Sequence, residues 1–388
     1  MSMTMTFVPS EPQSSGEIQI VSPERAADVE YKHHQVADFL ETHKFDALLL
    51  QKPSSFAWFT GGGDNSRRGS SETTASLFIT PDARVLVTSN VDSGLMFDRE
   101  LPALGFQLKE RPWHETRHIL VEDLCRGRKV ASDTGVGPTI DATSQIGLMR
   151  LPLTDFECTR MREVGHEVAH AVEATARNFA HRQTEAEIAG ELAHRLIRHD
   201  VTPERIQVWA DGQGHRYRHW AYGDDKVERY CVISVVGRKG GLCAGAARTV
   251  CFNSLPDILK AAHIAATLMQ ATGMYFSKAN WPISETWKRV ERIYEKYGYP
   301  EEWQFSDQAE LIGYEPCEIP IVPKSDFQLQ AGMALCWHPS IGPSIVGDTI
   351  LLTDKGYEVM TPMEGWPKVK VDVKQRTVSL PDVLRREP

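Results

Sequence analysis

The chain has 388 residues, of which 41% are hydrophobic and 24% are charged, a composition typical of globular proteins. It excludes a collagen-like fibre, a coiled coil and a mainly disordered chain. The net charge of -9 argues against a general nucleic-acid binder, because such a protein needs a basic face.

The location of the protein is predicted from its cysteines and from the absence of targeting segments. None of the seven cysteines belongs to a Cys-x-x-Cys pair, and the odd count indicates the reduced thiols of a cytosolic protein. Residues 1–17 lack the basic and apolar regions of a secretory signal. No apolar run reaches the roughly 18 residues of a membrane-spanning helix, so we expect a cytoplasmic protein without a membrane partner.

The first part of the chain is predicted to be a tail followed by an α/β domain. Residues 1–28 are rich in Ser, Pro, Gln and Glu, which is typical of a mobile tail. A helical pattern runs from Arg25 to His43, and strands alternate with helical segments beyond it. The expected strands are Phe45–Leu50, Ala75–Ile79, Arg84–Val87 and Gly127–Ala131. This alternation predicts an α/β domain over residues 29–153.

A second domain is expected over residues 154–388, because the pattern changes near residues 151–155. Thr184 and Glu187 form a capping-box pattern, in which each side chain satisfies a free backbone donor at a helix start. The expected helices are Asp155–His181, Thr184–His199, Pro256–Gly273 and Ser284–Tyr297, and the expected strands are Tyr230–Val236, Ala247–Phe252, Ala334–Trp337, Asp348–Thr353 and Glu358–Met360. Helices grouped around strands in this order predict the α+β fold class.

Several short strings in a fixed order resemble one known family. They are Phe45–Leu50, Phe59–Gly62, Arg162–Glu163, Thr184–Ala189, Arg248–Thr249, Gly332–Met333 and Asp348–Thr353. Together they resemble the creatinase, aminopeptidase P and prolidase group, the M24 family. The resemblance covers most of the chain. It implies a creatinase-like N-terminal domain, a pita-bread C-terminal domain and a homodimer.

The resemblance also implies where the metal ligands of the family's peptidases would fall. Those enzymes bind two divalent metals through two Asp, one His and two Glu, which together generate a hydroxide nucleophile. The corresponding positions, in that order, are Ser234 or Val235, Gly245, Glu310, His338 and Gly347. None of the five positions therefore carries the type of residue that the family's peptidases have there. We expect that the chain is not a dinuclear metallopeptidase and that it carries no cofactor.

By the same resemblance, creatinase works without metals and uses a histidine as acid and base. His219 falls at the matching place, and we predict it as the catalytic residue, with a solvated loop as the alternative. The creatinase carboxylates fall at Ala247 and Gly347 and are lost, whereas the arginine remains as Arg248. Arg248 is expected to hold a substrate carboxylate or, alternatively, to form a structural ion pair.

Glu310 and His338 stand in exchanged positions, because the family has His at the first and Glu at the second. The implied fold would point both into one cavity, with Asp348 next to them. Three interpretations remain open: a hydrogen-bonded pair that lines a small-molecule pocket, a buried structural pair, or a mononuclear site for zinc, manganese or iron. We assign all three residues to substrate binding.

Arg67 and Arg68 are the remaining substrate-binding candidates. In creatinase-like dimers an N-domain arginine near this place reaches the neighbouring subunit's pocket, and the alternative is an ordinary surface loop. Cys317 is expected in the core, with a thiol whose pKa is raised by Glu315 and Glu318.

The functional hypothesis that follows is a metal-independent hydrolase or lyase of a C–N bond in a small amino-acid-like or guanidino-like compound. A first alternative is an inactive homologue that serves as a binding or scaffold protein. A second alternative is an Xaa-Pro peptidase-like hydrolase with a rebuilt metal site. The expected partner is a small polar molecule or a short peptide, and no nucleic acid is expected.

Overall fold

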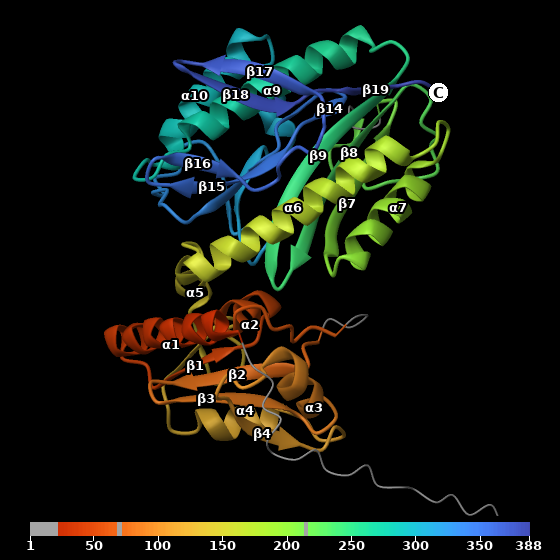
Figure 1. Ribbon diagram of the computed structural model, residues 1–388. Helices are drawn as coiled ribbons and strands as arrows, with labels where there is room; N and C mark the ends of the chain where they lie inside the picture. Colours follow the sequence, from red (N-terminus) through yellow and green to blue (C-terminus); the bar gives the residue numbers. More distant parts are fainter. Residues whose placement is uncertain (1–21, 68–71, 213–215) are drawn as a thin grey trace, which may run out of the picture.

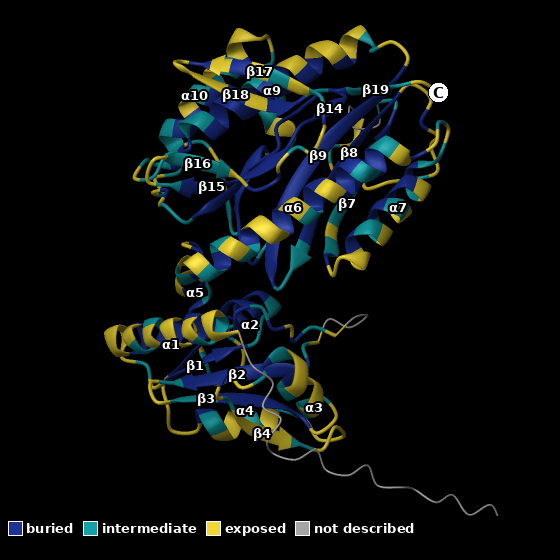
Figure 2. Ribbon diagram, in the orientation of Figure 1, coloured by how far each residue is buried: buried dark blue, intermediate teal, exposed yellow. Residues whose placement is uncertain are grey.

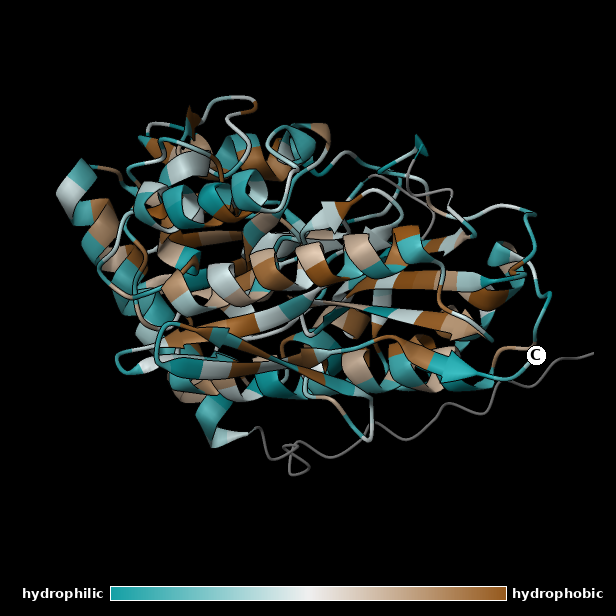
Figure 3. Cartoon of the chain, turned by 90° about the horizontal axis from the view of Figure 1, so that it is seen from above, coloured by the Kyte–Doolittle hydropathy of each residue, from teal (hydrophilic) through white to brown (hydrophobic). Residues whose placement is uncertain are grey.

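The computed structural model describes residues 22–67, 72–212 and 216–388, and it has a smaller N-terminal part and a larger C-terminal part (Figure 1). Figure 2 shows buried strands in both parts, with helices whose outer faces are exposed. In Figure 3, hydrophobic residues concentrate in the interior strands and hydrophilic residues in the outer loops. No helix in the described ranges is both long and apolar enough to cross a membrane.

The N-terminal part is built on a six-stranded sheet. Its elements are α1 Pro23–His43, β1 Ala47–Leu50, α2 Pro53–Thr60, β2 Ala75–Thr80, β3 Ala83–Ser89, α3 Ser93–Leu95, η1 Met96–Glu100, β4 Gln107–Arg111, α4 His118–Cys125, β5 Val130–Ser132, β6 Ile140–Asp141 and α5 Thr143–Arg150. The strand order is β4-β3-β2-β1-β5-β6. Strand β1 lies between β2 and β5 with all four residues buried, which explains its uninterrupted apolar sequence.

Helix α1 begins inside the predicted tail. Ser22 caps it by accepting a hydrogen bond from the Arg25 backbone N–H, and Pro23 occupies the first turn, where no backbone donor is needed. The helix ends at His43, and Lys44 caps it in a left-handed conformation with φ 56°. Residues 1–21 of the predicted tail lie outside the described residues. The domain division at residue 153 stays a prediction.

The C-terminal part contains two larger sheets with helices packed on them. Its elements are α6 Asp155–Asn178, α7 Glu185–Arg198, β7 Thr202–Ala210, β8 Tyr230–Lys239, β9 Leu242–Phe252, α9 Asp257–Phe276, α10 Ile283–Lys296, η2 Glu302–Phe305, β10 Ala309–Ile312, β11 Ile319–Pro320, β12 Ala334–Trp337, β13 Ser340–Ile341, β14 Ser344–Ile345, β15 Asp348–Thr353, β16 Gly356–Val359, β17 Lys368–Val373, β18 Arg376–Pro381 and β19 Leu384–Arg386. The sheet orders are β19-β9-β8-β7 and β11-β10-β12-β15-β16. A bridge between Ala247 and Gly347 joins these two sheets.

Two capping boxes fix the starts of the helices that cover the first of these sheets. The predicted box at Thr184 and Glu187 is confirmed, and Thr154 with Glu157 forms a second one at the start of α6. Helix α6 packs on β8 and β9, and α7 packs on β7 (Figure 1). The sequence patterns did not predict β7 or β10, and both strands turn out to hold residues of the candidate site.

A buried ion cluster connects α1 to the start of α6. Lys32 is fully buried, and its Nζ donates to Asp28 Oδ2 at 2.5 Å, to Glu157 Oε1 at 2.6 Å and to the Trp58 carbonyl at 2.8 Å. The Tyr314 hydroxyl donates to the same Glu157 oxygen at 2.5 Å. One ammonium group therefore neutralises carboxylates from both parts of the chain.

His263 on α9 gives the stability of the fold a defined dependence on pH. The side chain is buried, and burial lowers its pKa from 6.5, although Asp382 at 3.8 Å opposes the shift. The unfolded chain therefore binds a proton more readily than the folded one. The contribution to stability is fully present above about pH 6.5 and is lost as the pH falls from there toward the lower folded pKa.

We expect the melting temperature to fall between pH 7 and pH 5 in the wild type, and this fall to be smaller in His263→Gln. Differential scanning calorimetry over that range measures both. His34, which is exposed on α1, provides the matched control, and His34→Gln should keep the wild-type slope. An unchanged slope in His263→Gln would show that the buried imidazole is not its source.

Candidate functional site

The candidate site is a cluster of Asp307, Glu310 and His338 at the edge of two paired strands. Glu310 lies in β10, Asp307 precedes that strand, and His338 directly follows β12. Glu310 is opposite Cys336 in the register, and His338 continues the ladder with a backbone hydrogen bond to the Gln308 carbonyl at 2.9 Å. Because side chains alternate along a strand, Glu310 and His338 lie on the same face of the sheet.

The three side chains converge closely. His338 Nε2 forms a short hydrogen bond with Glu310 Oε2 and lies 3.8 Å from Asp307 Oδ2. One candidate ligand atom from each residue lies within 4.8 Å of the others. Glu310 and His338 are buried, whereas Asp307 is exposed at the rim. Glu310 Oε1 has no hydrogen-bond partner among the described atoms.

A cationic side chain, that of Arg205, borders this cluster. Arg205 on β7 lies 3.9 Å from Asp307 Oδ2 and 4.0 Å from Glu310 Oε1, and its Nε has no hydrogen-bond partner in the described structure. Burial raises the pKa of Asp307, but the charges of His338 and Arg205 outweigh it, so the net shift is downward. The carboxylate of Asp307 is therefore held in its ionised form.

His219, the predicted catalytic residue, lies at the exposed side of the same cluster. Its Nε2 is 3.9 Å from Asp307 Oδ1, and 71% of its side chain is exposed. The neighbouring Arg218 anchors this loop through a hydrogen bond to the Gly342 carbonyl at 2.8 Å and an ion pair with Glu302. Asp307 thus lies between His219 on one side and Glu310 with His338 on the other. The catalytic role of His219 stays a prediction.

Arg248 and Asp348 belong to a different, fully buried network. Arg248 Nε donates to Glu173 Oε1 at 3.0 Å, and its NH1 donates to Asp348 Oδ1 at 3.0 Å. Gln270 and Thr361 donate to the two Asp348 oxygens at 3.0 and 2.9 Å. Burial raises the pKa of Asp348, against the lowering effect of Arg248. These contacts support the structural alternative for Arg248, and its role in substrate binding stays a prediction.

The pleat explains why Asp348 does not join Glu310 and His338. Asp348 is paired with Trp337, one residue away from both Cys336 and His338 along β12. Alternation therefore sends Asp348 to the opposite face of the sheet, toward Gln270 on α9. The structure places Asp307 beside the pair instead. The local signal for Asp307 is its position three residues before Glu310. That signal indicates proximity only if the strand β10 is recognised, and the sequence patterns do not predict β10.

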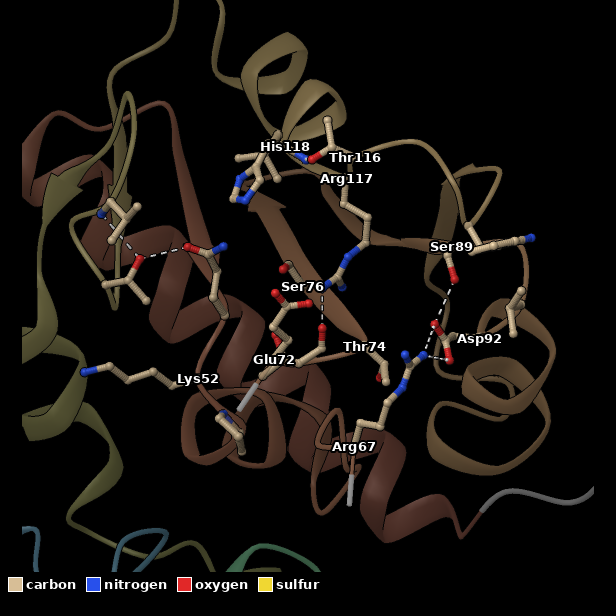
Figure 4. Close-up of a pocket in the computed structure, with 18 of the residues that line it drawn as sticks. Lys52, Arg67, Glu72, Thr74, Ser76, Ser89, Asp92, Thr116, Arg117 and His118 are labelled. Atoms are coloured by element: carbon tan, nitrogen blue, oxygen red, sulfur yellow. Dashed lines mark hydrogen bonds and ion pairs between the residues drawn. The ribbon is translucent and has the colours of Figure 1, made fainter. Parts of the chain in front are cut away.

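Arg67 lies far from the cluster, in a groove of the N-terminal part. Its guanidinium forms an ion pair with Asp92, with distances of 2.7 and 2.9 Å to the two carboxylate oxygens (Figure 4). The groove has a volume of about 890 Å³ and also contains Arg117 and His118. Arg68 lies outside the described residues. The substrate-binding assignment of both arginines stays a prediction.

Cys317 corrects one expectation. It was predicted in the core, but it is exposed. Its thiol pKa is raised to about 11, first by partial burial and then by Glu310, Asp307 and Glu318, so only the last of the two predicted carboxylates contributes. A protonated thiol of this kind is a poor nucleophile at neutral pH.

The fold thus combines a smaller α/β part with a larger part in which helices pack on two sheets, and the polar cluster lies at a strand edge of the larger part. The model of metallopeptidase family M24 matches residues 159–360, more than half of the chain, and the chain therefore belongs to that family. This confirms the family resemblance and the fold class. No curated protein matches the sequence.

Solved structures show the same fold at low sequence identity. The Xaa-Pro dipeptidase from Bacillus anthracis is 19% identical with a TM-score of 0.73, and the match covers 87% of this chain and 99% of that one. The prolidase from Pyrococcus horikoshii is 17% identical with a TM-score of 0.74, covering 86% and 99%. The N-terminal domain of the FACT complex subunit SPT16 from chickpea is 13% identical with a TM-score of 0.67, covering 88% and 96%. Such different proteins share the fold, so the fold alone does not determine activity.

The residues present do not fit the two-metal centre that the family resemblance implies. Three of the five positions carry no carboxylate, because they fall at Ser234 or Val235, at Gly245 and at Gly347. A Cβ added to Gly245 would lie 2.8 Å from the Cys336 sulfur, and one added to Gly347 would lie 3.2 Å from the His338 Cβ. The space for carboxylates at these two positions is thus occupied by neighbouring side chains.

Proposed function

We propose that this M24 family member is a hydrolase or lyase that breaks a C–N bond in a small amino-acid-like or guanidino-like compound, without the two-metal centre. The observation that carries the proposal is the cluster of Asp307, Glu310 and His338, with Arg205 and His219 within 4.0 Å of its carboxylates. Buried polar side chains next to a partly exposed guanidinium and an exposed imidazole suit a small polar substrate.

Arg205 and His219 have separate roles in the proposal. The guanidinium of Arg205, with its unpartnered Nε, holds an anionic group of the substrate. The imidazole of His219, a side chain that can act as both acid and base, takes a proton from the attacking water and gives it to the leaving nitrogen. Oxygen is then bonded to carbon, the C–N bond is broken, and water has been added across it.

The test is a panel of Xaa-Pro dipeptides, creatine-like guanidino acids and small amides, with released amine detected by mass spectrometry. For any substrate found, His219→Gln is expected to lower kcat/KM by at least about 100-fold, the lower end of the contribution of a general acid–base. The matched control His34→Gln, in an exposed histidine on α1, should keep wild-type activity. Full activity in His219→Gln would exclude this mechanism.

Arg205 separates binding from proton transfer. Arg205→Gln is expected to raise KM for substrates that carry a carboxylate more than for uncharged analogues, whereas Arg205→Lys should recover part of the loss. If no compound in the panel is turned over while some of them raise the melting temperature, the chain is a binding protein that has kept the fold.

We further propose a homodimer and a cytoplasmic location, which follow from the family resemblance and the reduced cysteines. Light scattering coupled to size-exclusion chromatography tests the first proposal, and cell fractionation tests the second.

A further inference from the structure

We propose that Asp307, Glu310 and His338 bind a single divalent cation. This site differs from the family's two-metal centre, because it uses neither of the Asp positions nor the last Glu position, and Asp307 completes it. It also differs from the sequence expectation of no cofactor, which considered Asp348 as the third residue. The inference stands independently of the proposed function.

The geometry of the cluster suits one ion. Each of the three residues offers an atom within 4.8 Å of the other two, and His338 Nε2 is 3.8 Å from Asp307 Oδ2. Ligand atoms in a tetrahedral zinc site lie about 3.3–3.6 Å apart, because each metal–ligand bond is about 2.0–2.2 Å long. Small side-chain rotations therefore bring the three atoms around one cation and leave a fourth position for water.

The buried carboxylate of Glu310 independently points to a ligand. The residue is 2% exposed, yet its Oε1 has no hydrogen-bond partner in the described structure, and the guanidinium of Arg205 is 4.0 Å from it. Leaving a buried acceptor without a partner destabilises the fold, and a charged acceptor does so more than a neutral one. A cation at the cluster would satisfy this oxygen without moving β10.

The donor set limits the metals that the site would select. One imidazole and two carboxylates suit zinc, manganese or iron, and the site lacks the six or more oxygen ligands that calcium prefers. Arg205 carries a positive charge at 3.9 and 4.0 Å from two of the ligand atoms. Its repulsion weakens cation binding, so removing that charge should strengthen it.

The test measures metal content directly. The full-length protein, free of any affinity tag, is stripped with a chelator, reloaded with ZnCl₂ or MnCl₂, desalted and analysed by inductively coupled plasma mass spectrometry. The expected result is one ion per chain. Competition with a chromophoric chelator then gives the affinity of each variant. Activity is not needed, so failure of this site and failure of the proposed function are distinguishable.

Glu310→Gln and His338→Gln should each lower the affinity by more than the roughly 10- to 100-fold that loss of an outer-shell partner costs. Arg205→Gln should raise it. The matched control is Glu364→Gln with His166→Gln, an exposed histidine–carboxylate pair on the surface with a 2.6 Å contact, and these variants should bind as the wild type does. Asp307→Asn, at an exposed position, serves as a ligand variant if a buried one fails to fold.

Three results would overturn the proposal. The first is a wild-type protein without stoichiometric metal after reloading. The second is a set of ligand variants with wild-type affinity. The third is a loss of metal when the surface control pair is replaced. A Co²⁺-loaded protein provides the second measurement, because a site with these three ligands gives visible d–d absorption that the ligand variants should lose.

Discussion

Lys32→Met is expected to destabilise the protein by about 3–5 kcal/mol, the usual cost of removing one partner from a buried ion cluster. The Lys32 ammonium donates to a carboxylate oxygen of Asp28 at 2.5 Å and to one of Glu157 at 2.6 Å, and all three side chains are at most 2% exposed. Without the ammonium, two negative charges remain buried close together. The fold then has to protonate them or open the contact between α1 and α6.

Urea unfolding followed by tryptophan fluorescence measures this loss. Lys109→Met, at an exposed position in β4, is the matched control and should change stability by no more than about 0.5 kcal/mol. Replacing all three charged residues by Lys32→Met, Asp28→Asn and Glu157→Gln should recover part of the stability, because no unpaired charge then remains buried. A loss below about 1 kcal/mol for Lys32→Met alone would contradict the account.

Arg248→Met is expected to cost a similar amount, about 3–5 kcal/mol, because it leaves Glu173 and Asp348 without their shared cation. Both distances from the guanidinium are 3.0 Å, and the side chain of Arg248 is fully buried. Gln270 and Thr361 stay hydrogen-bonded to Asp348, but they are neutral and do not compensate its charge.

Arg162 provides the control for this experiment. It pairs with Glu358 at 2.8 Å, and nearly half of each side chain is exposed. An exposed pair contributes about 0–1 kcal/mol, so Arg162→Met should have little effect. If Arg248→Met has the same free energy of unfolding as the wild type but no longer binds a carboxylate-containing ligand, Arg248 binds the substrate. Its interpretation as a structural residue is then wrong.

The sequence predicted elements whose signals are local. Helix starts with a capping box, such as Thr184 with Glu187, and short apolar runs, such as the one around β1, can be recognised because the interactions lie within a few residues. The family resemblance depended on such strings and on their order. The edge strand β7 and the short strand β10 were missed, because their stability comes from pairing with distant strands.

The candidate site likewise has members that the sequence indicates and members that it does not. The exchanged pair of Glu310 and His338 was recognised from the sequence, since it depends on which residue stands at a family position. The third member was assigned to Asp348, and the pleat of β15 sends that side chain to the other face of the sheet. No sequence pattern indicates Arg205, because it approaches from a strand about 100 residues earlier in the chain, a separation that no local pattern spans.

The sequence by itself therefore determined the class of fold and the family, since these are properties of residue type and order, whereas the loss of the two-metal ligands stays a prediction. Only the tertiary structure decided which charged groups share one site. Asp307, Glu310 and His338 meet because β10 and β12 pair in one register, whereas Arg248 and Asp348 are drawn into a buried ion pair. Electrostatic energy depends on distance in space, and a linear sequence does not contain that distance.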